Sequence, residues 1–321
     1  MEVKSVLPWQ QDAWSSLTGL IGGDRLPHGL LLEGQQGTGR TDFAEALTAL
    51  LLCAQPVDGV ACGQCRSCEL LRSGAHSDFR RVEPAEAGKA IGIDAIRAAI
   101  SFATGTATLG SRKVLLVAPA ESMTVAAHNA FLKCLEEPSP GTHIILVVNR
   151  GHPIPATIRS RCQRWQLPTP DEDVALSWLQ SQDRVELDGE SAGSLLALAG
   201  GRPLAALDLA DGEGVEALGR LHGAITAVAE GGRDAGLVLE RVAADVELPV
   251  LLDALDTHAQ AFLRGQHGDA LKTDRARQAF LVLDHVRNLR RAVRSGTNPN
   301  PDLVRFQVTK EWSRLWGSQT Q

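Results

Sequence analysis

Several features that define other classes of protein are missing from this sequence. No run of about 18 uninterrupted apolar residues occurs, which excludes a transmembrane helix. The start, Met1 to Trp9, lacks the charged-then-apolar pattern of a secretory signal. Lys and Arg number 32 against 38 Asp and Glu, a net charge of −6, so the basic excess of a dedicated nucleic-acid binder is absent. Six cysteines are too few for a disulfide scaffold of this length. We therefore expect a soluble, cytoplasmic protein with no membrane partner.

The length and the distribution of apolar residues indicate more than one domain. At 321 residues with 44% hydrophobic side chains, the chain can form two or three domains with sizeable cores. Short apolar runs alternate with helical patterns up to residue 167, as in βαβ units with a parallel sheet. Beyond Pro168-Thr169-Pro170 only helical patterns remain. The sequence predicts an α/β domain over 1–167, a small helical domain over 168–210 and a larger helical domain over 211–321, with a linker signal at 211–214.

The same patterns predict individual elements. In the α/β domain we expect strands at 28–33, 78–83, 113–118, 142–148 and 164–167, and helices at 42–52, 93–103 and 122–136. In the helical part we expect short helices at 171–180, 191–199 and 203–209, then longer ones at 215–230, 233–246, 249–265, 274–294 and 301–316.

A glycine-rich turn follows the first expected strand. Gly34-Gln35-Gln36-Gly37-Thr38-Gly39-Arg40-Thr41 fits the phosphate-loop spacing G-x-x-x-x-G-K-[S/T], except that Arg40 replaces the lysine. Glycines let backbone N–H groups face a phosphate, and the next helix adds a favourable dipole. The planar guanidinium of arginine is not equivalent to the compact charge of lysine. The turn indicates phosphate-loop ancestry, whereas ATP binding by Gly34, Gly37, Gly39, Arg40 and Thr41 is doubtful; a turn that needs glycine only for its shape is the alternative.

The acidic partner of a working phosphate loop is also missing. Phosphate-loop ATPases end a later strand with an acidic residue that holds Mg²⁺, usually followed by a catalytic glutamate. Here the strand at 113–117 is followed by Ala118-Pro119-Ala120-Glu121, so the first carboxylate comes too late in the chain. ATP hydrolysis by this chain alone is therefore not expected.

Four cysteines are clustered within sixteen residues. Cys53, Cys62, Cys65 and Cys68 have the spacing C-x8-C-x2-C-x2-C. Two-residue gaps let neighbouring thiolates turn onto one tetrahedral Zn²⁺, and four protein ligands leave no open position for catalysis. An iron–sulfur cluster is less favoured because its fourth cysteine usually follows the other three. We predict a structural zinc site, with Cys134 and Cys162 as ordinary core residues.

Two arginines, Arg159 and Arg161, lie where the α/β domain ends, in the sequence T-I-R-S-R-C. A pair of arginines is usually part of a solvated surface. After a degenerate phosphate loop, another interpretation is an arginine delivered in trans to a neighbour's γ-phosphate, which is worth roughly 10³–10⁵ in rate.

Four segments together resemble the delta-prime family of bacterial DNA polymerase III clamp-loader subunits, within the AAA+ superfamily. They are Leu26-Pro27-His28-Gly29-Leu30-Leu31, the four-cysteine module at 53–68, Asn129-Ala130-Phe131-Leu132-Lys133-Cys134-Leu135-Glu136-Glu137-Pro138, and Ser160-Arg161-Cys162. The resemblance covers nearly all of the first 165 residues. The C-terminal half is similar only in its helical pattern and weakly around Asn300 to Val304.

The resemblance implies a RecA-like AAA+ α/β domain, a small helical lid domain and a helical collar domain. ATP-hydrolysing relatives have lysine where Arg40 stands and an Asp-Glu pair where Ala118 and Pro119 stand. They also have a sensor arginine where this chain has Leu204, with Arg202 two residues early. Asn149 aligns with the first sensor.

Departures at three ATPase elements imply a non-hydrolysing subunit of a hetero-pentameric clamp loader. By the same resemblance, Arg161 of the S-R-C motif, with Ser160, acts as an arginine finger in trans. The implied partners are ATPase subunits, a clamp-opening subunit, the sliding clamp and, indirectly, primer–template DNA.

Two other functions are weighed against this one. An active AAA+ ATPase is opposed by Ala118 and Pro119. A zinc-dependent nucleic-acid module would need basic residues around the cysteines, where only Arg66 and Arg72 are found. A further group of arginines, on one face of the helix expected at 274–294, is interpreted mainly as a solvated face, with packing or a DNA phosphate as alternatives: Arg287, Arg290, Arg291 and Arg294.

Overall fold

The computed structural model describes residues 4–86, 88–182, 189–210, 214–232, 234–294 and 300–316. The chain divides into two compact units, one of residues 1–181 with 201–205 and one of residues 182–200 with 206–321. The first contains the sheet and the second is helical, so the predicted fold class of an α/β region followed by helices is confirmed. The division into three domains stays a prediction, and of the linker signal at 211–214 residues 211–213 lie outside the described residues.

The first unit is built on a five-stranded parallel sheet with the order β2-β3-β4-β1-β5. Gly29 is paired with Ile144, and Lys113 with Thr142, so β1, β3 and β4 have their carboxyl ends at one edge of the sheet. The three central strands are nearly continuous apolar runs because helices cover both of their faces. The strands are β1 (Gly29–Gly34), β2 (Phe79–Val82), β3 (Lys113–Val117), β4 (Thr142–Asn149) and β5 (Gln163–Gln166).

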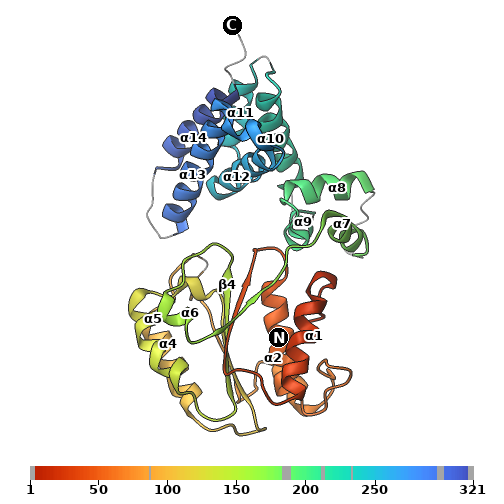
Figure 1. Ribbon diagram of the computed structural model, residues 1–321, viewed down its shortest axis with the longest axis vertical. Helices are drawn as coiled ribbons and strands as arrows, with labels where there is room; N and C mark the ends of the chain where they lie inside the picture. The colour runs from red at the N-terminus through yellow and green to blue at the C-terminus, as the bar shows by residue number, and fades with distance from the viewer. Residues whose placement is uncertain are drawn as a thin grey trace. The chain divides into compact units, whose positions relative to one another are not determined.

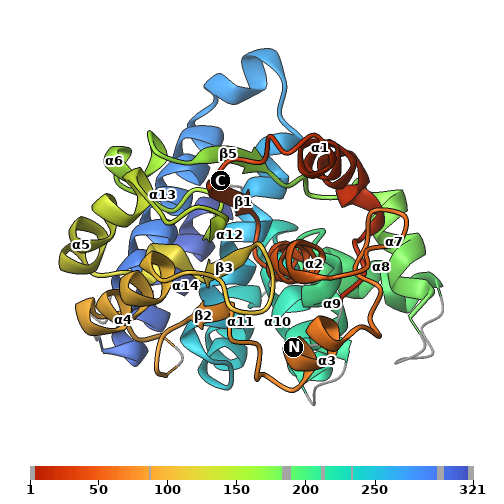
Figure 2. The same ribbon diagram turned by 90° about the horizontal axis from the view of Figure 1, so that it is seen from below.

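Helices enclose the sheet in two layers (Figures 1 and 2). On one face, Ile96 of α4 (Ile93–Thr104) and Phe131 of α5 (Val125–Glu136) join Leu115 and Ile144 in one core. On the other, Phe43 of α2 (Arg40–Leu52) joins a second core. Each large apolar side chain buried in this way contributes about 1.5–3 kcal/mol. The second layer is formed by α1 (Gln11–Gly22), α2 (Arg40–Leu52) and α3 (Arg66–Arg72).

The helix predicted at 122–136 begins later than expected. Ala120–Ser122 forms a short 3-10 turn, η2, and α5 starts at Val125. The start is fixed by Thr124, whose side-chain oxygen accepts a hydrogen bond from the backbone N–H of Ala127 at 3.2 Å. The shorter elements of the unit are η1 (Pro8–Gln10), α6 (Ala156–Arg159) and α7 (Glu172–Gln180).

The second unit is a helical bundle. Its core includes Leu221, Leu255, Val286 and Trp312, and Trp312 is among the largest fully buried side chains of the chain. None of the helices in the described residues has both the length and the apolar character needed to cross a membrane. The helices are α8 (Gly189–Leu198), α9 (Pro203–Ala210), whose first residues belong to the first unit, α10 (Gly214–Ala229), α11 (Ala235–Ala244), α12 (Leu248–Arg264), η3 (Gly268–Lys272), α13 (Asp274–Arg294) and α14 (Pro301–Trp316).

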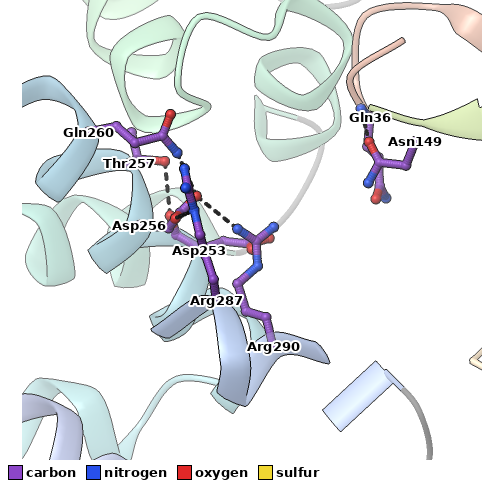
Figure 3. A network of polar contacts seen from close by, with 8 residues as sticks. All are labelled: Gln36, Asn149, Asp253, Asp256, Thr257, Gln260, Arg287 and Arg290. Carbon is purple, nitrogen blue, oxygen red and sulfur yellow. Dashed lines mark hydrogen bonds and ion pairs between the residues drawn. The ribbon is translucent and has the colours of Figure 1, made fainter. Parts of the chain in front are cut away.

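An ion cluster joins α12 to α13 (Figure 3). Asp256 is buried, and its two carboxylate oxygens lie 3.1 Å from Arg287 Nε and 2.8 Å from Arg290 Nη1. Arg290 also contacts Asp253 at 2.7 Å, and the Gln260 amide donates to Asp256 at 2.7 Å.

The interpretation of the α13 arginines as a solvated face is therefore wrong for Arg290, whose side chain is largely covered by its contacts with α12, whereas Arg287 stays exposed although it is paired with Asp256. Their partner, Asp256, lies on a different helix, α12, so the sequence of α13 alone could not predict the pairing. Arg291 is exposed, and the side chain of Arg294 lies outside the described residues.

A half-buried histidine pair makes the stability of the second unit depend on pH. His258 Nε2 and His222 Nδ1 lie 2.8 Å apart, which requires one donor and one acceptor, so at least one ring is neutral. Burial, with the neighbouring His258, lowers the pKa of His222 to about 4, and burial lowers the pKa of His258. Because an unfolded histidine titrates near pH 6.5, the unfolded chain binds more protons between pH 6.5 and 4. The stabilisation is complete above about pH 6.5 and is lost as the pH falls toward 4.

We expect His222→Gln to flatten the pH dependence of unfolding. Between pH 7.5 and 5 the wild-type free energy of unfolding should fall by about 1–3 kcal/mol from this pair, since each pKa unit corresponds to about 1.4 kcal/mol. Urea unfolding of the full chain at the two pH values measures the change. His267→Gln, at an exposed position, is the matched control and should behave as wild type. An equal pH dependence in His222→Gln would contradict the assignment.

Candidate functional sites

The glycine-rich turn predicted to be a phosphate loop lies between a strand and a helix. It connects the carboxyl end of β1 to the first residue of α2, Arg40, as the sequence predicts. Gly37 and Gly39 have φ values of 81° and 82°, a conformation that favours glycine. The Arg40 guanidinium turns back and donates from Nη1 to the carbonyl of Gly34 at 3.3 Å, at the opposite end of the turn. Arg40 thus links the last part of the turn to its first residue through its side chain.

The chain's own residues contact this loop from two sides. Near the N-terminus, Trp9 Nε1 and Gln10 Nε2 both donate to the carbonyl of Thr38 at 3.0 Å, and Gln10 also donates to that of Gly39 at 3.1 Å. From the segment at 201–205, the Leu204 N–H donates to the carbonyl of Gly37 at 3.1 Å. The loop is consequently held by protein groups and not only by its glycines.

These contacts also explain why the loop needs glycine. A side chain on Gly39 would meet Leu7 Cδ1 at 2.2 Å, and one on Gly37 would meet Ala205 Cβ at 2.7 Å. Leu204 contacts the loop through its backbone N–H. Arg202, two residues before Leu204, also lies against the loop: its Cβ is 3.3 Å from the point where a side chain on Gly37 would begin.

No carboxylate follows directly at the end of β3. Val117 is followed by Ala118 and a cis Pro119, and Glu121 lies in η2. Glu121 Oε1 accepts the backbone N–H of Asn149 at 3.1 Å, so this carboxylate is directed at the end of β4. Asn149 Oδ1 in turn accepts the backbone N–H of Gln36 at 3.2 Å (Figure 3). One N–H group of the phosphate loop is therefore bonded to protein.

Arg161 lies at the surface of the first unit, just after α6. Its Nε donates to Glu136 Oε1 at 2.8 Å and its Nη2 also contacts Glu136, while Nη1 donates to Thr157 O at 2.9 Å and to Ser160 Oγ at 3.2 Å. The Ser160 hydroxyl donates to Thr157 O at 3.1 Å. Arg161 and Ser160 therefore form one hydrogen-bonded turn, with the guanidinium partly exposed.

The four clustered cysteines have the geometry of a metal site. Their Sγ atoms all lie within 4.8 Å of one another, with separations of 3.5 Å for Cys53–Cys62, 3.9 Å for Cys53–Cys65 and 3.6 Å for Cys65–Cys68. A tetrahedral zinc with bonds near 2.3 Å places sulfurs about 3.8 Å apart. The Cys62 and Cys65 N–H groups donate to Sγ of Cys53 and Cys62 at 3.3 Å. This set could bind a metal ion such as zinc.

The cysteine environments differ in how easily each thiol ionises. Burial opposes ionisation of Cys65, but hydrogen bonds, chiefly from the Cys68 and Ala54 backbone, lower the pKa of its thiol to about 6. Burial raises the pKa of Cys68 to about 12. A bound cation would stabilise all four thiolates, so metal affinity should increase with pH. Cys134 and Cys162 are buried elsewhere, and burial raises the pKa of each thiol to about 11, as expected of core residues.

A polar chain ties the cysteine module to the sheet. The backbone N–H of Asp78 donates to His76 Nδ1 at 3.1 Å, so His76 carries its proton on Nε2 and donates to Ser67 Oγ at 2.6 Å. The Ser67 hydroxyl donates to the carbonyl of Leu52 at 2.6 Å. This direction leaves the serine without a base, so the group is structural and not a nucleophilic site.

Comparison with known proteins now assigns the fold and these motifs to a family. A family model described as "DNA polymerase III, delta subunit" matches residues 9–171, about half of the chain. The chain belongs to this family. The match includes the phosphate-loop turn, the cysteine module and Ser160-Arg161-Cys162.

Curated relatives are similar to the chain over about two thirds of its length. The chain is 42% identical over 210 residues to DNA polymerase III subunit delta' of Pseudomonas aeruginosa, covering 65% of this chain and 62% of that protein. It is 35% identical over 210 residues to the Escherichia coli subunit delta', with the same coverage. The matches thus span less than two thirds of these relatives. A solved structure of a DNA polymerase III gamma-subunit-related protein from Thermotoga maritima covers 94% of this chain and 98% of its own, with 18% identity and a TM-score of 0.49.

Sequence reasoning missed the residues that surround the family's motifs. It did not predict α1 or the 3-10 turn before it, although Trp14, Leu17 and Ile21 have helical spacing. It also missed α3 within the cysteine module, and the hydrogen bond between Ser67 of that helix and His76 beyond it. The contact of Arg161 with Glu136 joins residues 25 positions apart, and no local signal marks it.

Proposed function

We propose that this chain is the non-hydrolysing subunit of a replicative clamp loader. In this proposal its first unit supplies Arg161 in trans to ATP bound by a neighbouring ATPase subunit, and the complex places a sliding clamp on primed DNA. The observation that supports it most strongly is the combination of a phosphate loop held by the chain's own residues with a partly exposed arginine outside that loop.

The environment of the loop argues against an active ATPase. Mg²⁺-assisted phosphoryl transfer needs a carboxylate beside the phosphates, and Ala118 and Pro119 offer none. Glu121 is the first acidic residue after the end of β3, and its Oε1 accepts a hydrogen bond from the backbone N–H of Asn149. Arg40 donates to Gly34 at the base of the loop. Metal-assisted hydrolysis at this loop would require several of these contacts to change.

The cysteine module serves as a structural zinc site in this proposal. Cys53, Cys62, Cys65 and Cys68 would supply all four ligands, so the metal stabilises the loop between α2 and α3 and has no open position for catalysis. A nucleic-acid-binding role for the module has little support. Of its two nearby arginines, Arg72 donates to the carbonyl of Gly63 within the module itself.

The purified chain is expected to show no Mg²⁺-dependent ATP turnover above the protein-free background. Combined with the ATPase and clamp-opening subunits of its own organism, it should raise their turnover at least about 10-fold, because a finger in trans is worth far more than that at one site. Phosphate release at saturating ATP measures both quantities. Turnover by the chain alone would favour an active ATPase, and an unchanged rate on mixing would contradict the proposal.

A further inference from the structure

Arg161 is bonded to a residue from a different motif. Its Nε donates to Glu136 Oε1 at 2.8 Å, and Nη2 contacts the same oxygen. Glu136 is the last residue of α5, and its side chain is 46% exposed, against 32% for Arg161. The pair is thus at the surface, where an ion pair stabilises the fold by only about 0–1 kcal/mol. Its contribution to stability does not explain why an acidic side chain stands here.

The position of Glu136 is locally unfavourable. The C-terminal end of a helix carries partial negative charge, and a carboxylate there costs roughly 0.3–1 kcal/mol unless a cation compensates. Glu136 and Glu137 are two carboxylates at this end of α5. Arg161 is the cation that compensates Glu136. A residue that is unfavourable for its own helix but bonded to a partly exposed arginine indicates a role in placing that arginine.

Three distant segments come together around this arginine. His28, just before β1, contacts the carbonyl of Leu135 with Nε2 at 2.9 Å, and because a carbonyl only accepts, His28 donates. The end of α5 that carries Glu136 is thereby tied to the start of β1. At Gly29, an added side chain would begin 3.0 Å from the carbonyl of Arg161, so this glycine lets the backbone of the S-R-C turn approach β1. The backbone of Arg161 is positioned by β1 and its side chain by α5.

The guanidinium is held in one orientation. Of its five N–H groups, Nε and one of Nη2 face Glu136, and the two of Nη1 have Thr157 O and Ser160 Oγ as acceptors. Within the described part of the chain, the second N–H of Nη2 has no acceptor. A phosphate arriving from outside would thus meet a charge that is already oriented. Orientation of this kind matters because a catalytic group misplaced by about 1 Å can lower the rate about 10²-fold.

We propose that Glu136 is a positioning residue for Arg161. It holds the guanidinium through Nε and one N–H of Nη2, so that the remaining N–H of Nη2 is directed at a phosphate on a neighbouring subunit. This inference rests on the proposed function. Glu136 itself does not touch the nucleotide in this arrangement; it acts through the arginine.

The test uses the assembled clamp loader in which each ATPase subunit carries alanine at its own S-R-C arginine, so that Arg161 is the remaining finger. Glu136→Gln keeps the shape of the side chain and removes its charge. We expect it to lower kcat for ATP about 10-fold to 100-fold and to change KM less than about 3-fold, because the altered contact matters in the transition state. Glu136→Asp, which keeps the charge on a shorter stem, should retain more activity than Glu136→Gln.

Glu137→Gln is the matched control. This neighbouring residue is exposed and makes no ion pair or side-chain hydrogen bond within the described residues, so its kcat should equal that of wild type. Thermal unfolding of each purified variant verifies that it is folded. The coupling is measured in Arg161→Ala, where adding Glu136→Gln should produce no further loss, since residues that act as one unit are not additive.

The outcomes separate the two proposals. If Glu136→Gln reduces kcat equally with and without Arg161, or leaves it unchanged, Glu136 does not position the finger. A higher kcat in Glu136→Gln would mean that Glu136 restrains the arginine, which also overturns the inference. If Arg161→Ala itself keeps the wild-type kcat, the proposed function fails and this inference fails with it.

Discussion

Arg161→Ala is expected to lower ATP turnover at the site next to this chain by about 10³-fold or more. An arginine finger neutralises charge that develops on the transferred phosphoryl group, and its removal costs roughly 10³–10⁵ in kcat. A 10³-fold loss corresponds to about 4 kcal/mol of transition-state stabilisation. The side chain is partly exposed and its backbone lies against β1, so truncation should leave the fold of the first unit intact.

The measurement is phosphate release by the assembled complex in which Arg161 is the remaining finger. Arg159→Ala is the matched control: it removes the same charge two residues earlier, from an exposed side chain of α6. It should leave the rate within about 2-fold of wild type. Arg161→Lys keeps the charge but loses the planar fork, so it should recover only part of the rate. Wild-type turnover in Arg161→Ala would exclude the finger.

Cys65→Ser is expected to reduce bound zinc from one ion per chain to well below one and to unfold the module around residues 53–72. Structural zinc sites in small peptides contribute about 10–16 kcal/mol of apparent binding free energy, which becomes folding free energy where no other core exists. The module has little core of its own: Val57 and Val60 are exposed, and Cys68 and Leu71 are its buried apolar residues. Its order should therefore depend on the metal.

Elemental analysis gives the zinc content, and limited proteolysis shows whether the segment at 53–72 becomes cleavable. Cys134→Ala is the control, because it removes a buried thiol that lies outside the cluster. It should keep one zinc and resist cleavage. The site would be disproved by wild-type chain that contains far less than one ion, or by Cys65→Ser that retains a full one.

The parts of the fold that could be predicted are those with a strong periodic signal. The apolar runs of β1, β3 and β4 and the long helices of the second unit lie within a few residues of their predicted bounds. The cysteine site could be predicted because its ligands are close in sequence, so spacing alone brings their sulfurs together.

Other features depend on contacts between distant segments. Gln10 contacts the phosphate loop 28 residues away, and Asp256 is paired with arginines 31 and 34 residues away. Neither residue has a pattern that distinguishes it from an ordinary surface or core position. The covered position of Arg290 could not be predicted for this reason: helical spacing places the α13 arginines on one face but does not say what that face meets.

The glycine at position 29 has a consequence for how such chains change over time. Its backbone is an ordinary strand conformation, so nothing in its own dihedral angles requires glycine. The preference for glycine comes from the Arg161 carbonyl, 3.0 Å from where a side chain would begin. The two sites, 132 positions apart, are thus under one steric constraint. A larger residue at position 29 would press on the Arg161 carbonyl, so a chain that keeps the S-R-C turn in this place would have to shift it by a few tenths of an ångström to accept one.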